Sequence, residues 1–110
     1  MNDLLDVVFT NADSAHRQHL ASESFAEHEA LGEFYADVRD AADAFTEAAI
    51  GLDVAPPDGS TDIVGELEAG LIDLSQMRDH VCQGNNTLLN KFDELTGVYA
   101  KALFKLKRLA

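Results

Sequence analysis

Three of the four histidines of this chain, His16, His19 and His28, lie within thirteen residues of one another. Further on, Asp43 and Glu47 are four residues apart, which places both carboxylates on one side of a helix. Imidazole nitrogens with carboxylate oxygens suit a hard-to-borderline ion such as iron, manganese or zinc. The spacing therefore predicts a metal site whose ligands come from neighbouring helices. By itself, however, the spacing favours the alternative that the acids are exposed and the histidines are polar caps in a helical bundle.

The first two histidines belong to a helix predicted over about residues 3–22. Its apolar positions alternate at steps of three and four, the spacing of one helix face. They are Leu5, Val8, Ala12, Ala15 and His19. By the 100° turn per residue, His19 lies near the centre of this stripe and His16 roughly 60° to one side. A histidine in that place needs a hydrogen-bond partner or a ligand.

The third histidine and the two acids belong to the longest helical pattern, over about residues 25–51. Ser24 stands three residues before Glu27, in the order of a capping box. Gly51 is a suitable stop. The predicted core seam is His28, Leu31, Tyr35, Val38, Ala42, Phe45 and Ala49.

Both prolines fall in residues 52–60, where neither helix nor strand can continue. A third helix is predicted over about 61–83, with Ser60 or Thr61 as its N-cap and Gly84 as its stop. Its seam is Ile63, Leu67, Gly70, Leu74, Met77 and Val81. A fourth is predicted over about 86–109. Its seam is Leu88, Phe92, Leu95, Tyr99, Ala102, Leu106 and Leu109.

Four amphipathic helices joined by two tight turns and one longer loop predict an all-α fold, an antiparallel four-helix bundle. At 110 residues the chain fits one domain, 1–110, with one core. The middle loop suits either a hairpin or a crossover along the bundle.

Charge and composition exclude several classes of protein. Twenty acidic residues against eight basic ones give a net charge of −12, which repels nucleic acid and anionic membranes. The start of the chain predicts no signal peptide, and no apolar run reaches the roughly 18 residues of a membrane span. The single Cys82 excludes an internal disulfide and is predicted to be a buried or half-buried hydrophobe.

The basic residues gather in the predicted last helix. Lys101, Lys105, Lys107 and Arg108 crowd its final turns, where cations complement the negative end of the helix dipole. A binding patch is the alternative interpretation of this cluster.

The long second helix also carries an outward strip. By the wheel, Asp43 and Glu47 project about 120° and 160° away from its core stripe. The residues that share this outer sector are Phe25, Gly32, Ala36 and Ile50. A strip that mixes aromatic, small and carboxylate residues suits a second subunit better than water. We therefore expect a homo-oligomer with an interface across this helix.

A family resemblance rests on the same residues. Those that carry it are Ala15, His16 and His19, the run from Ser24 to Leu31, then Phe34, Tyr35, Asp43 and Glu47, and finally Asp93, Glu94, Leu95, Tyr99, Leu103, Leu106 and Leu109. Together they resemble the pattern of a phage-encoded family of small ferritin-like proteins of uncharacterised function. The resemblance implies a ferritin-like bundle, a phage origin, and a location in the host cytoplasm or the virion.

More distantly, the first half resembles the Dps miniferritins, which bind iron between two subunits. This implies His28 as the second-helix histidine, Asp43 and Glu47 as the acids, and His19 or His16 as the first-helix histidine. Two positions depart from the pattern. The acid expected one turn after His28 is Gly32 and the usual tryptophan is Leu20, so one bridging oxygen ligand is missing.

Two functions follow from the resemblance and the strip. In the first, the chain is a bacteriophage structural or assembly protein, a virion component without catalysis that binds copies of itself and other phage structural proteins. In the second, His16, His19, His28, Asp43 and Glu47 bind iron or another divalent metal between subunits, as a Dps-like scavenger or weak ferroxidase. The incomplete ligand set favours the first, with no cofactor.

Overall fold

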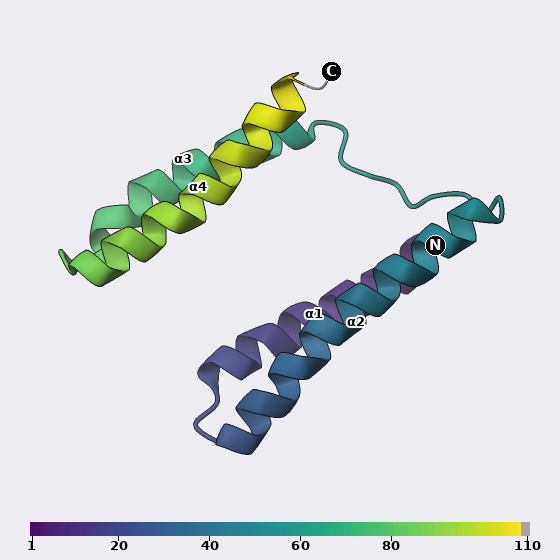
Figure 1. Ribbon diagram of the computed structural model, residues 1–110, viewed down its shortest axis with the longest axis horizontal. Helices are drawn as coiled ribbons and strands as arrows, with labels where there is room; N and C mark the ends of the chain where they lie inside the picture. Colours follow the sequence, from purple (N-terminus) through teal and green to yellow (C-terminus); the bar gives the residue numbers. More distant parts are fainter. Residues whose placement is uncertain (109–110) are drawn as a thin grey trace. The chain divides into compact units, whose positions relative to one another are not determined.

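A computed structural model describes residues 1–108 of the chain, which form four α-helices and no strand within that range. They are α1 (Asn2–Ala21), α2 (Phe25–Gly51), α3 (Ile63–Cys82) and α4 (Asn86–Arg108) (Figure 1). The chain divides into two compact units, Met1–Gly59 and a second unit that begins at Ser60. Each unit is a helical hairpin. The all-helical prediction is confirmed, with helix ends within two residues of those expected where they are described; Leu109 lies outside the described residues.

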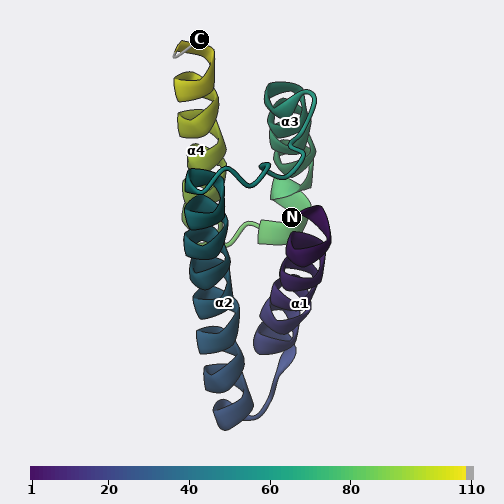
Figure 2. The same cartoon turned by 90° about the vertical axis from the view of Figure 1, so that its right-hand side faces the viewer.

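The first hairpin pairs α1 with α2 through a three-residue turn, which makes the two helices antiparallel neighbours (Figure 2). The Ser22 hydroxyl donates to the Ser24 carbonyl, and the Ser24 hydroxyl accepts from the Glu27 amide at 3.3 Å. This N-cap satisfies one of the orphan amide donors of the first turn of α2. The predicted start of this helix is therefore confirmed.

The core of the first hairpin is built from small residues. Ala12 and Ala15 of α1 are buried, as are Ala42 and Thr46 of α2. Small side chains allow two helix backbones to approach closely. Phe45, expected in the seam, is instead 54% exposed within this structure, because Thr46 takes its place opposite α1. The remaining seam residues of both helices are buried or half-buried, as predicted.

The N-cap of α3, the first helix of the second hairpin, lies one residue after the two predicted cap positions. Asp62, rather than Ser60 or Thr61, caps α3, and its carboxylate accepts from the Gly65 amide at 3.0 Å. Ser60 serves this turn in another way, by donating to Glu66 at 2.6 Å. A Cβ at Gly65 would lie 2.1 Å from an Asp62 carboxylate oxygen, so the glycine leaves room for the cap.

The contact face of the second hairpin is rotated from the predicted seams. The side chains that are buried or half-buried between α3 and α4 are Val64, Leu67, Leu71, Leu74, Arg78 and Cys82, with Leu89, Phe92, Thr96, Tyr99, Ala102 and Leu103. The predicted seam residues that are exposed are Ile63, Met77, Val81, Leu88, Leu95 and Leu106. On each helix the apolar stripe is wide enough to contact two neighbouring helices. The partner helix of the hairpin covers only half of the stripe, and the exposed residues lie on the other half.

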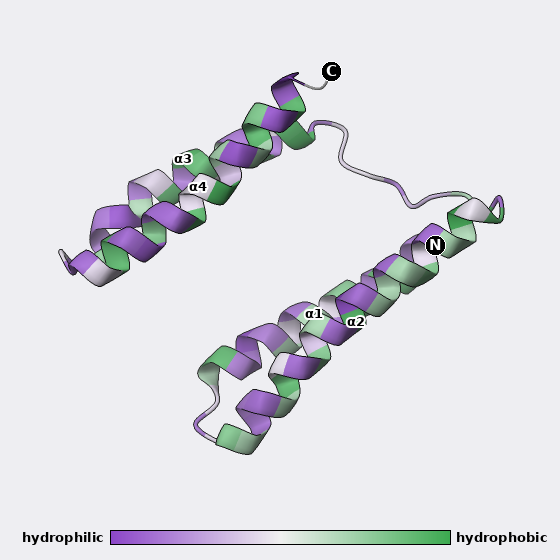
Figure 3. Cartoon of the chain, in the orientation of Figure 1, coloured by the Kyte–Doolittle hydropathy of each residue, from purple (hydrophilic) through white to green (hydrophobic). Residues whose placement is uncertain are grey.

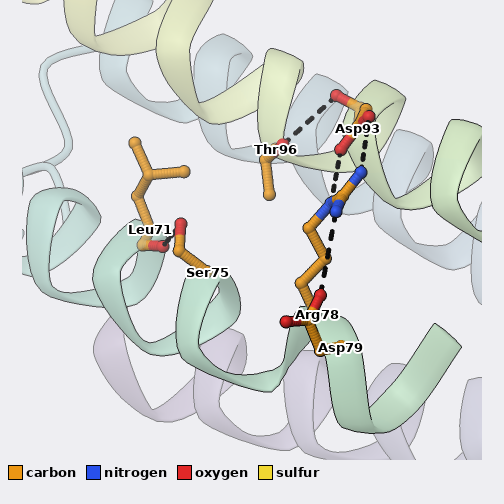
Figure 4. A network of polar contacts seen from close by, with 6 residues as sticks. All are labelled: Leu71, Ser75, Arg78, Asp79, Asp93 and Thr96. Carbon is orange, nitrogen blue, oxygen red and sulfur yellow. Dashed lines mark hydrogen bonds and ion pairs between the residues drawn. The ribbon is translucent and has the colours of Figure 1, made fainter. Parts of the chain in front are cut away.

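Two further features fix the second hairpin. Cys82, the most enclosed side chain of the second hairpin, is buried, in agreement with the prediction. Beside it, Arg78 of α3 donates from Nε and Nη2 to the two carboxylate oxygens of Asp93 on α4, at 2.9 and 3.0 Å (Figure 4). Gly70 receives the Tyr99 ring, since a Cβ there would lie 3.3 Å from Tyr99 Cε2.

Candidate functional site

The aromatic and imidazole rings of the first hairpin gather at its turn end. His19 is in the last turn of α1 and His28 in the first turns of α2, nine residues apart and centred on the turn at 22–24. In an antiparallel hairpin, residues equally distant from the turn lie opposite each other. The rings of His19 and His28 stack at 3.7 Å between centroids, with an angle of 19° between their planes.

Reciprocal hydrogen bonds lock this pair. Nδ1 of His19 donates to the carbonyl of His28 at 2.5 Å, and Nδ1 of His28 donates to the carbonyl of His19 at 2.6 Å. A carbonyl oxygen only accepts, so both Nδ1 atoms carry the proton and, in the neutral ring, both Nε2 atoms are unprotonated. The His19 carbonyl is one that the end of α1 leaves without an intrahelical partner. The Nδ1 of His28 thus caps an open carbonyl at the C-terminal end of α1, and the Nδ1 of His19 links the end of α1 to the first turn of α2.

Two more rings extend the stack. His16 lies on Tyr35 at 3.9 Å with an interplanar angle of 8°, and Tyr35 is tilted against His19 at 5.5 Å. The rings of His16 and His19 are 6.2 Å apart. We call His16, His19, His28 and Tyr35 the ring cluster.

Gly32 shows why the expected acid is absent one turn after His28. A Cβ at Gly32 would lie 3.0 Å from Cε1 and 3.1 Å from Nδ1 of His19, tighter than ordinary van der Waals contact. A side chain there would require the His19 ring to shift by a few tenths of an ångström against its stacking and hydrogen-bond partners. Gly32 was expected on the outward strip with Phe25, but it is half-buried and lies against α1. The ring of His28, a residue of the predicted core seam, also faces α1, because it stacks on His19.

The two acids lie far from the ring cluster along α2. Asp43 follows His28 by fifteen residues, roughly 22 Å of helix rise, and Glu47 by nineteen, roughly 28 Å. Both are exposed. Phe25, Ala36 and Ile50 are also exposed, as the outward strip requires, and Phe25 is 78% exposed. The structure therefore separates the predicted ligands of one chain into two groups.

The residues of a single chain do not fit a metal centre. The lone pair of each Nε2 lies in its ring plane, and two nearly parallel stacked rings cannot direct these lone pairs at one ion. Within residues 1–108 no three His, Cys, Asp or Glu side chains are grouped as metal ligands. The ring cluster does have one feature of metal-binding histidines, since each Nδ1 proton of the stacked pair is held by a carbonyl.

Sequence reasoning missed the stacking of the histidines, the role of Gly32 and the Arg78–Asp93 pair. For the first, a signal was present: His19 and His28 are equidistant from the Ser-rich turn. The signal for the Arg78–Asp93 pair was weaker: Arg78 lies on a face of α3 that carries apolar residues one turn before and one turn after it. In the described range, no helix is long and apolar enough to cross a bilayer.

Comparison with known proteins gives a family but no activity. Residues 19–106 match a family described as a family of unknown function, DUF5856. The chain belongs to this family. The match includes His19, His28 and most of both hairpins, while His16 falls before it. No curated protein and no solved structure matches the chain.

Proposed function

We propose that this DUF5856 member is a structural or assembly subunit of a bacteriophage, which acts by binding other copies of itself and other phage structural proteins. The observation that carries the assembly role is the exposed apolar surface on both hairpins, and above all Phe25 at the start of α2. Patches of this kind on a helical protein mark binding surfaces. The phage setting rests on the resemblance described above.

The first part of the proposal is that the two hairpins pack as one antiparallel, ferritin-like four-helix bundle. In the first hairpin, the exposed apolar residues to one side of the α1–α2 contact are Leu4, Val7, Phe34, Phe45 and Leu52. In the second hairpin, the exposed residues of the predicted α3 and α4 seams form a similar apolar face. Hydrophobic and polar residues alternate around every helix, as expected of amphipathic helices with more than one neighbour (Figure 3).

The second part is that the outward strip of α2 binds another copy. Phe25 and Ile50 lie at equal distances from the middle of the helix, near Asp37, with Ala36 between them. A two-fold axis through that point places Phe25 of each copy opposite Ile50 of the other, an isologous interface. The small side chain of Ala36 lets the two helices approach at the axis.

The test of this interface is the mass of the particle in solution. Wild-type protein is expected to be a dimer or larger by light scattering, and the double variant Phe25→Asp, Ile50→Asp is expected to be a monomer with unchanged helix content. Val98→Asp, on an exposed position of α4, is the matched control and should leave the mass unchanged. A wild-type monomer at every concentration would contradict the proposal. Mass spectrometry of purified virions tests the phage role, and absence of the chain contradicts it.

A second candidate function, binding of iron, manganese or zinc between subunits, is favoured by the anchored Nδ1 atoms of the ring cluster. The same two-fold axis places His28 of one copy opposite Glu47 of the other, because these two positions are symmetric about the middle of α2, and Asp43 lies one helical turn from Glu47. Metal analysis of protein purified without chelator decides between the two. About one ion per subunit, lost in His28→Ala and Asp43→Ala, would favour this candidate.

A further inference from the structure

We propose that the cationic end of α4 docks on the acidic outer face of α2 of a second copy, and so joins copies head to tail. The cationic end is Lys101, Phe104, Lys105 and Arg108. The acidic face is Ala26, Glu29, Ala30, Glu33 and Asp37. This inference deepens the proposed assembly role, and it rests on the antiparallel packing proposed there.

The charges of the chain are divided unevenly between its hairpins. Residues 1–59 hold thirteen acidic side chains and two arginines, and residues 60–110 hold seven acidic and six basic ones. The net charges are therefore −11 and −1. Residues 101–108 contain four basic side chains and no acid. The last turns of α4 are thus a cationic patch on a strongly acidic protein.

The cationic end forms one exposed row. Lys101, Lys105 and Arg108 are spaced i, i+4 and i+7, so they share one side of α4. The guanidinium of Arg108 lies over the ring of Phe104 at 5.4 Å, and that ring is 63% exposed. Lys107 is different, because it pairs with Glu68 of α3 at 3.5 Å. Within residues 1–108, Lys101, Lys105 and Arg108 make no ion pair.

The acidic face has a similar repeat and an apolar floor. Glu29, Glu33 and Asp37 are spaced four residues apart, roughly 6 Å along the helix, and the steps of the cationic row are roughly 6 and 4.5 Å. An open hollow of about 250 Å³ lies on this face, lined by Ala26, Glu29, Ala30 and Glu33. Two alanine methyl groups between two carboxylates suit an aromatic ring flanked by cations. Phe104 with its neighbouring basic side chains has that chemistry.

The occupant is a second copy, since charge complementarity selects the cationic end and the packing proposed above keeps that end away from the acidic face of its own chain. In an antiparallel up-and-down bundle, the start of α2 and the end of α4 are at opposite ends, since α2 and α4 then run in the same direction. The 27 residues of α2 span roughly 40 Å. A contact between two different surfaces of identical copies is heterologous, and such contacts build rings or open filaments.

Charge reversal with rescue tests the pairing, measured by sedimentation velocity at about 50 and 500 mM salt. Wild-type protein is expected to form species larger than a dimer at low salt and to lose them at high salt. Lys101→Glu, Lys105→Glu, Arg108→Glu should abolish the larger species, as should Glu29→Lys, Glu33→Lys, Asp37→Lys. Combining the six substitutions should restore them. The control, Arg17→Glu with Lys91→Glu, adds negative charge elsewhere and should leave them in place.

Zero-length carboxyl–amine cross-linking of mixed unlabelled and ¹⁵N-labelled protein gives a second readout. Cross-links from Lys101 or Lys105 to Glu29 or Glu33 that join one labelled and one unlabelled chain support the proposal. Links only within one chain would overturn both the inference and the antiparallel packing. Assembly that is unaffected by either charge reversal would overturn the inference alone. Capture of a short DNA duplex by the cationic end, without charge-dependent assembly, would also overturn it.

Discussion

The two hairpins of this chain share a topology but differ in what holds them together. The first buries small residues, Ala12, Ala15, Ala42 and Thr46, and closes its turn end with the ring cluster. The second buries Phe92, Leu103 and Cys82 and adds the two-pronged Arg78–Asp93 pair. None of the large apolar side chains of the first hairpin is fully buried in it, although several are half-buried. The second buries one aromatic ring, Phe92, in its own core.

The largest expected effect tests this difference in cores. Phe92→Ala should lower the free energy of unfolding by about 3–4 kcal/mol, because it removes a ring that is only 9% exposed. Phe45→Ala should cost about 2 kcal/mol if the second hairpin covers that ring as proposed. Chemical denaturation monitored by circular dichroism measures both. A Phe45→Ala variant within about 0.5 kcal/mol of wild type would mean that this face is bare.

The next largest expected effects come from glycine substitutions in the two hairpins. Gly32→Ala should destabilise the protein by about 1–2 kcal/mol, because the new methyl group meets the His19 ring, which its stack and hydrogen bond hold in place. Gly70→Ala should be within about 0.5 kcal/mol of wild type, since the half-buried Tyr99 ring can move by the few tenths of an ångström required.

Gly97→Ala is the control for both glycine variants. A Cβ at Gly97 would meet no atom within 4 Å, so this change should stabilise α4 by roughly 0.5–1 kcal/mol through helix propensity alone. Thermal unfolding of the three variants ranks them. Equal stabilisation by all three would refute the role of Gly32 as the seat of the His19 ring.

A smaller effect concerns the pH dependence of the second hairpin. The Arg78 hydrogen bonds lower the pKa of Asp93 below its ordinary value near 3.8. A carboxyl group with a lowered folded-state pKa contributes stability above its unfolded pKa and loses it as the pH falls through the folded pKa. Arg78→Gln should therefore raise the Asp93 pKa and flatten the acid limb of stability. Carboxyl carbon chemical shifts measured by NMR during titration report the change; an unchanged Asp93 pKa contradicts it.

The smallest expected signal is spectroscopic. Nitrogen-15 NMR of the imidazole rings near neutral pH should show His19 and His28 protonated at Nδ1, whereas the exposed His80 of α3 should show the mixture typical of a solvated ring. Gly32→Ala should shift the His19 signals towards those of His80. Nε2-protonated neutral rings at His19 and His28 would contradict the reciprocal bonds.

The helices themselves followed from the sequence, because capping residues and three-four spacing are local properties of the chain. Ser24 and the prolines marked boundaries correctly, and the seam of α1 was predicted residue by residue. Asp62 was missed as a cap because Ser60, Thr61 and Asp62 are all suitable residues at neighbouring positions. The metal-ligand hypothesis could name residue types but not their directions in space.

Only the tertiary structure decided which half of each apolar stripe meets its hairpin partner. Periodicity gives the angle of a side chain around its own helix, whereas the rotation of one helix against another depends on which residues are small enough to permit close approach. For that reason Thr46 replaced Phe45, and Val64 and Leu71 replaced Ile63 and Met77, in the contact faces. The stacking of His19 on His28 beside Gly32 depends on the same rotation of one helix against the other. A glycine has no side chain, so the sequence pattern does not indicate which residue packs against it.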